Sequence, residues 1–127
     1  MDKKLAVIFD MDGVLLDTAR FNSLSFDELL KPKGLNMDML ADKHGEGFRG
    51  TSLAKMLGVI KEDHGVEFDV QDFSKQAGEV AFQLMDKENI KGDPHLELLL
   101  KDLKNAGILV GIGTSSLRWR VEPILNR

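Results

Sequence analysis

Two carboxylates separated by a single residue, Asp10 and Asp12, follow directly on a short apolar run and precede Gly13. If that run is a buried strand, the pair lies at the carboxyl edge of an α/β sheet, where such sheets bind ligands. A carboxylate there can attack phosphorus and form an acyl phosphate, which water then cleaves. The spacing therefore predicts phosphoryl transfer with Asp10 as the nucleophile. Asp12 would protonate the leaving oxygen and later deprotonate water.

The same two carboxylates predict a metal site. Repulsion between an anionic nucleophile and a phosphate must be offset, and hard oxygen ligands suit Mg²⁺, which can bridge carboxylate and phosphate oxygens. We therefore expect Asp10 and Asp12 to be metal ligands and Mg²⁺ to be the cofactor. A calcium loop would need further oxygen ligands at fixed offsets, where Val14, Leu15 and Leu16 stand instead. A polar turn without chemistry is the remaining alternative.

A hydroxyl-rich triplet, Thr114-Ser115-Ser116, follows a second apolar run and precedes a predicted helix. Hydroxyls and free backbone N–H groups at a helix N-terminus form an anion site. If the two strands are neighbours, this triplet faces the carboxylate pair. We expect Thr114 and Ser115 to bind the phosphate, together with Gly13, which permits backbone angles and close approaches that other residues resist. The alternative is that the triplet only caps the helix.

The apolar spacing predicts how these motifs are positioned. Two short runs rich in strand formers, residues 5–9 and 108–112, are typical of strands buried in a parallel sheet. The spacing between them is helical. We expect helices over about residues 21–30, 53–60, 70–87 and 96–105, and a last one from residue 117 or 118. The strands should be parallel neighbours joined by a right-handed crossover, and the long insert after the first strand is best read as a small helical domain.

Composition excludes several classes of function. The chain has 127 residues and a net charge of −4 with both signs spread along it, so a basic patch for nucleic acid is missing. The absence of Cys removes disulfides and thiolate metal sites, which fits a reducing cytoplasm. No stretch is long and apolar enough to span a bilayer. We expect a cytoplasmic protein with no nucleic-acid or membrane partner.

The segment Phe9–Val14 with Asp17-Thr18, followed by Gly111–Ser116, resembles the haloacid dehalogenase-like (HAD) hydrolase superfamily. The subgroup is the one with a helical cap, as in phosphoglycolate phosphatase and beta-phosphoglucomutase. The resemblance implies an α/β fold, with an incomplete Rossmann-like core at residues 1–16 and 92–127 and an all-helical cap at residues 17–91. It also implies a Mg²⁺-dependent phosphatase that acts on a small phosphorylated metabolite through an aspartyl-phosphate intermediate. Dehalogenases that resemble this motif lack an Asp at the position of Asp12.

The resemblance also bears on substrate choice. In similar enzymes a segment such as His44–Ser52 can face the substrate, so Arg49 could bind a second anionic group, although a solvated Arg is the plainer alternative. Asn22 lies where related sugar-phosphate mutases often have a His. This residue favours a phosphatase over a phosphomutase.

Two further motifs of the superfamily, one with a Lys or Arg and one with an acidic metal ligand, normally lie well beyond the Thr/Ser motif. Only 11 residues follow Ser116, and we expect Arg118 and Arg120 among them to be surface residues. We therefore expect a truncated N-terminal part of a longer enzyme, with weak or no activity alone. An oligomer or a partner chain would cover its exposed sheet edges. The alternatives are a beta-phosphoglucomutase-like phosphomutase and a non-catalytic interaction module.

Overall fold

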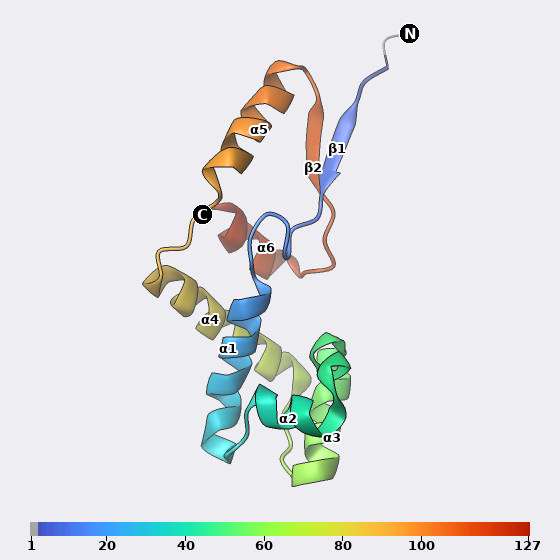
Figure 1. Cartoon of the computed structure of the whole chain (residues 1–127), viewed down its shortest axis with the longest axis vertical. Helices are drawn as coiled ribbons and strands as arrows, with labels where there is room; N and C mark the ends of the chain where they lie inside the picture. Colours follow the sequence, from blue (N-terminus) through green and yellow to red (C-terminus); the bar gives the residue numbers. More distant parts are fainter. Residues whose placement is uncertain (1–2) are drawn as a thin grey trace. The chain divides into compact units, whose positions relative to one another are not determined.

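The computed structural model describes residues 3–127, without the side chains of Glu46 and Arg49. The chain forms two compact units: one takes the described residues up to Ala19 together with Glu88–Arg127, and the other is Arg20–Lys87. The elements in chain order (Figure 1) are β1 (Ala6–Phe9), α1 (Ala19–Leu30), the 3₁₀ turn η1 (Lys31–Lys33), α2 (Met37–His44), the 3₁₀ turn η2 (Glu46–Gly50), α3 (Leu53–His64), α4 (Val70–Lys87), α5 (Pro94–Asn105), β2 (Leu109–Ile112) and α6 (Arg118–Leu125).

The first unit is built on β1 and β2, which pair in parallel as the sequence predicts. The register runs from Ala6 opposite Leu109 to Phe9 opposite Ile112. The helix α5 leads into β2 and packs on it. Its N-terminus is fixed by Asp93, whose carboxylate accepts the His95 N–H at 2.7 Å. The α/β class predicted from the sequence is therefore confirmed, and the described chain is mostly helical.

The two faces of the sheet are covered differently. Because side chains alternate along a strand, Phe9, Val110 and Ile112 lie on one face, and they line an apolar pocket with residues of α5 and α6. Ile8 and Leu109 lie on the opposite face and are 73% and 60% exposed. Among residues 3–127, no further strand pairs with either edge of the sheet.

The second unit consists of helices and short turns (Figure 1). These elements pack around one apolar core. The core residues come from α1 to α4 and the turns between them: Leu30, Leu35, Met37, Leu40, Phe48, Met56, Leu57, Ile60, Phe73 and Ala77. The predicted helix 70–87 matches α4. The N-cap of α3 is Ser52, whose hydroxyl accepts the Lys55 N–H at 3.3 Å. In residues 3–127, no helix combines the length and the apolar character needed to cross a bilayer.

The helix α2 is a feature that the sequence analysis did not predict. It begins after Asn36, whose side chain accepts the Met39 N–H at 2.8 Å. A second cap comes from α1, where Asp27 accepts the Met37 N–H at 2.6 Å. Eight residues give only two turns, so the apolar spacing is too short to stand out from a loop. The cap from Asp27 fixes the start of α2, which the local apolar spacing does not predict.

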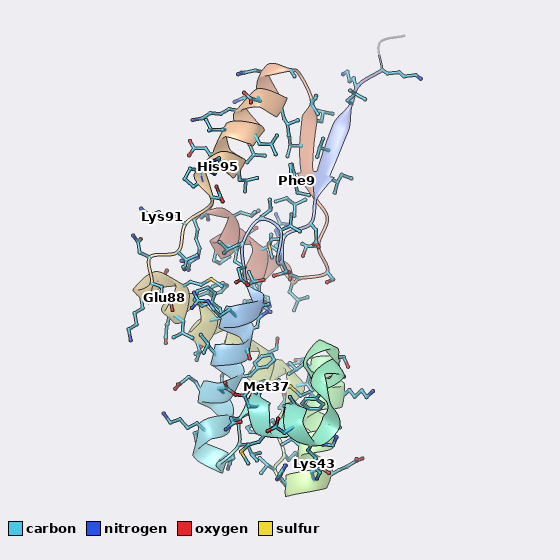
Figure 2. All side chains as sticks on the ribbon, viewed as in Figure 1. Phe9, Met37, Lys43, Glu88, Lys91 and His95 are labelled. Atoms are coloured by element: carbon cyan, nitrogen blue, oxygen red, sulfur yellow. The ribbon has the colours of Figure 1, made fainter. Side chains whose placement is uncertain are left out.

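An ion-pair cluster joins the C-terminal ends of α2 and α3. Asp63 on α3 accepts from His44 Nε2 at 2.6 Å and from Lys43 Nζ at 3.0 Å (Lys43 is labelled in Figure 2). The hydrogen bond from Lys43, followed by that from His44, holds the pKa of Asp63 below its ordinary value of 3.8. The His44 ring also stacks on Phe48, with centroids 5.3 Å apart. The cluster thus ties the two helix ends to the turn that follows α2.

We expect Asp63→Asn to lower the stability of the protein at neutral pH but not in strong acid. A carboxylate whose pKa is lower in the folded state stabilises the fold above its unfolded pKa, and the effect is lost as the pH falls through the folded pKa. Urea unfolding at pH 7 and at about pH 2 would measure the difference between variant and wild type. Asp42→Asn, at an exposed position of α2, is the matched control. An Asp63→Asn deficit that is equal at both pH values would contradict this account.

Candidate active site

The loop after β1 is a tight turn in which Met11 is the central residue. The Met11 side chain is fully buried, and its carbonyl accepts N–H groups from Val14 at 3.2 Å and Leu15 at 2.9 Å. Asp10 and Asp12 flank this buried side chain, and they are exposed and half-buried respectively. Phe9, labelled at the end of β1 in Figure 2, marks where this loop starts. The two carboxylates therefore follow the carboxyl end of the strand, as predicted.

Gly13 has a backbone conformation that explains its place in the motif. Its φ of +76° lies in the left-handed region, where residues other than glycine are strained. Its N–H donates to the carbonyl of Leu16 at 2.9 Å, which closes the turn. The turn keeps the loop short and returns the chain toward Thr18.

Asp12 is held by two hydroxyl groups that come from different parts of the chain. Thr18, fully buried, donates from Oγ1 to Asp12 Oδ1 at 2.5 Å. Ser116 donates from Oγ to Asp12 Oδ2 at 2.7 Å. Both oxygens of Asp12 are thus acceptors of a hydroxyl proton. Asp10 is exposed, and its Oδ1 accepts the N–H of Met11 at 2.8 Å.

The loop after β2 lies beside the loop after β1. The Gly113 N–H donates to the carbonyl of Phe9 at 2.9 Å, which continues the strand pairing past its end. Thr114 follows, half-buried, and its Oγ1 accepts the Ser116 N–H at 3.1 Å. Ser115 is exposed. The structure therefore brings the hydroxyl triplet close to the carboxylate motif. Within the triplet, Ser116 is the residue that the structure shows hydrogen-bonded to Asp12.

The alternative prediction, that the triplet at residues 114–116 only caps the helix that follows it, does not agree with the structure. The helix α6 begins at Arg118, its N-cap residue is Leu117, and no side chain caps it. The hydroxyl of Ser116 is instead directed to Asp12. Arg118 donates from Nε to Glu122 at 2.7 Å, so its guanidinium serves a pair within α6 on the protein surface, as expected.

The two residues proposed for substrate selection belong to the second unit. Asn22 is half-buried on α1, and its backbone carbonyl accepts the Ser25 hydroxyl at 2.8 Å. Arg49 lies in η2, but its side chain is outside the part of the chain that the structure describes. The roles of both residues stay predictions.

The carboxylates of Asp10 and Asp12 are of the chemical type that a hard divalent cation prefers as ligands. Asp10 and Asp12 offer oxygen donors, and Mg²⁺ takes few protein ligands and keeps several waters. Among the side chains that the structure describes, no group of three His, Cys, Asp or Glu residues converges in a way that could hold a metal. The metal-binding role of Asp10 and Asp12 stays a prediction.

Two residues that act on the site were not assigned by the sequence analysis. Thr18 and Ser116 belong to the motifs, but the carboxylate that each one binds is fixed only by the fold. A hydroxyl residue six positions after an Asp carries no specific signal in a single sequence. The contact of Ser116 with Asp12 joins residues 104 positions apart.

A sequence model described as haloacid dehalogenase-like hydrolase matches residues 7–127 of the chain. Among curated proteins, none matches it significantly. Several solved structures are similar in fold. A CbbY variant from Rhodobacter sphaeroides in complex with xylulose-1,5-bisphosphate has a TM-score of 0.74 and 20% identity, and the match covers 98% of this chain and 56% of that one.

Two further structures resemble the chain. A HAD family hydrolase from Deinococcus radiodurans R1, with bound phosphate and sodium, has a TM-score of 0.60 and 23% identity, covering 97% of this chain and 52% of that one. A beta-phosphoglucomutase from Clostridium difficile has a TM-score of 0.61 and 26% identity, covering 90% and 52% respectively. The chain thus spans about half the length of each of these three proteins.

We expect Thr18→Val to destabilise the protein by about 1–3 kcal/mol. The change keeps the shape of a fully buried side chain but removes the hydroxyl that donates to Asp12, leaving a carboxylate oxygen without that donor. Urea denaturation followed by circular dichroism would measure the loss. Thr18→Ser, which retains the hydroxyl, should recover most of it. Equal stability of Thr18→Val and the wild type would show that the hydrogen bond is unimportant.

Proposed function

Because the chain belongs to the haloacid dehalogenase-like hydrolase family, we propose that it carries the catalytic acids of a phosphoric-ester hydrolase acting on a small phosphorylated metabolite. One observation carries the proposal: the hydroxyl of Ser116, in the loop after β2, holds Asp12 by a hydrogen bond. Asp10 and Asp12 both follow β1, so this contact lies at the carboxyl edge of the sheet. That is the edge at which α/β sheets bind ligands. The complexes of similar proteins with phosphate and with a sugar bisphosphate support this substrate class.

The proposed reaction has two steps that use the two carboxylates differently. Asp10 attacks the phosphorus, and the bond from phosphorus to the leaving oxygen breaks as the aspartyl phosphate forms. Asp12 gives a proton to the leaving oxygen, and then removes a proton from the water that attacks the aspartyl phosphate. Free phosphate leaves and Asp10 is regenerated.

Phosphate binding falls to the groups around these carboxylates. The Oγ1 of Thr114 accepts the N–H of Ser116, so its own hydroxyl proton can be donated to a phosphate oxygen. Ser115 is exposed and can donate in the same way. Gly13, with its left-handed backbone, allows a close approach to the turn.

We propose Mg²⁺ as the cofactor, with Asp10 and Asp12 as its protein ligands. The ion would neutralise charge on the phosphate and on the nucleophile. The supporting observation is the chemistry of the donors, two carboxylates beside hydroxyl groups, which matches the preference of Mg²⁺ for oxygen.

We further propose that residues 17–91 serve as a cap that selects the substrate, while residues 1–16 and 92–127 carry the chemistry. The division into two compact units supports this assignment. Arg49 and Asn22, both in the helical unit, are the residues that we propose for substrate contacts.

A phosphomutase is the second candidate, because one similar structure is a beta-phosphoglucomutase. It would pass the phosphoryl group to a sugar phosphate rather than to water. A third candidate is a non-catalytic interaction module or oligomer, favoured by the uncovered sheet face at Ile8 and Leu109. Conversion of isomers without free phosphate would identify the second, and a folded chain without turnover the third.

We expect the chain to release phosphate from small sugar phosphates slowly in the presence of Mg²⁺, and Asp10→Asn to abolish the release. Turnover should be slow because fixed positive charge supplies much of phosphoryl-transfer catalysis, and the site offers mainly carboxylates and hydroxyls. Asp10→Asn keeps the size of the side chain but removes the nucleophile. A colorimetric phosphate assay with and without Mg²⁺ would measure both.

Asp42→Asn, on α2 in the other unit, is the control for a generic loss of one carboxylate. Release of phosphate that persists in Asp10→Asn, or that does not require a divalent cation, would refute the proposed function.

A further inference from the structure

Ser116 makes two hydrogen bonds that serve different parts of the candidate site. Its side-chain hydroxyl donates to Asp12 Oδ2 at 2.7 Å, and its backbone N–H donates to Thr114 Oγ1 at 3.1 Å. The first bond crosses from the loop after β2 to the loop after β1, and the second stays within its own loop. One residue thus links the proposed acid/base to the proposed phosphate-binding hydroxyl.

The single proton of a hydroxyl decides what Ser116 can do. A Ser hydroxyl donates one hydrogen bond, and in this structure that proton is directed to Asp12. It is therefore not available to a phosphate oxygen at the same time. Thr114 is in the opposite position, because its oxygen accepts the N–H of Ser116 while its own proton is left for a ligand. The two hydroxyls of the triplet have different tasks.

The orientation of Asp12 depends on two donors, and only one of them comes from the loop after β2. Thr18 binds Oδ1 from a position six residues later in the same loop region, and it is fully buried. Ser116 binds Oδ2 from 104 positions away and is half-buried. Without Ser116, Thr18 would still hold one oxygen. The carboxylate would then lose its link to the loop that carries Thr114.

We propose that Ser116 is a positioning residue that sets Asp12 in a fixed relation to the phosphate-binding loop. The inference deepens the proposed function and rests on it for the role of Asp12. It adds a division of roles in which Thr114 and Ser115 bind phosphate and Ser116 orients the acid/base. The side chain that positions Asp12 need not touch the substrate.

The first experiment separates positioning from phosphate binding. Ser116→Ala removes the hydroxyl but keeps the backbone N–H that binds Thr114. We expect kcat for phosphate release to fall roughly 10- to 100-fold, the size of one lost hydrogen bond to a charged group. The affinity for inorganic phosphate with Mg²⁺, measured by calorimetry, should change less than about threefold. Ser116→Thr, which keeps the hydroxyl, should restore kcat.

Two outcomes of this experiment would overturn the inference. A loss of phosphate affinity as large as the loss of kcat would make Ser116 a direct phosphate ligand. An unchanged kcat would show that Asp12 does not need the contact. Ser74→Ala, on α4 in the other unit, controls for the loss of a serine hydroxyl as such.

The second experiment does not require turnover. A double-mutant cycle of Asp12→Ala and Ser116→Ala in urea unfolding should give a coupling of about tenfold or more in the unfolding equilibrium constant. The same cycle with the exposed neighbour, Ser115→Ala, should give none. Absence of coupling for Ser116 overturns the inference whatever the activity. Clear coupling in a chain that neither binds nor releases phosphate refutes the proposed function alone, because the link between Asp12 and Ser116 would stand.

Discussion

The parallel pairing of β1 with β2 is the interaction on which the candidate site depends. The ladder does not end with the strands, because the Gly113 N–H reaches the carbonyl of Phe9 at 2.9 Å. Since parallel strands end at the same edge, this register brings the loops after the two strands side by side. A slip of one residue would turn each side chain to the other face of the sheet and would separate Asp12 from Ser116.

The loops add order to what the strands bring together. Met11 is buried in the loop after β1, and the turn at Gly13 leads the chain back so that Thr18 reaches Asp12. Asp12 becomes the most constrained polar group of the site, with a hydroxyl on each oxygen. Asp10 is exposed, which is compatible with the nucleophilic role that we propose for it. The two acids differ in surroundings although they are chemically identical.

Local patterns predicted most of the helices because their physical basis is local. The amphipathic spacing of α4 and the caps of α3 and α5 are properties of a few adjacent residues. The helix α2 was not predicted, because its start depends in part on another helix. Asp27 of α1 accepts the Met37 N–H. Its far end is likewise tied to α3 through Asp63.

The sequence by itself determined the chemistry available to this protein. Asp10, Asp12 and the hydroxyl triplet stand directly after two apolar runs, and residue type and position along a strand are read without a fold. Only the tertiary structure decided which groups meet. It assigned the Ser116 hydroxyl to Asp12 rather than to a helix cap, and it added Thr18 as the second donor. The physical reason is that a hydrogen bond depends on atoms lying within about 3 Å, and no local pattern records the approach of residues 104 positions apart.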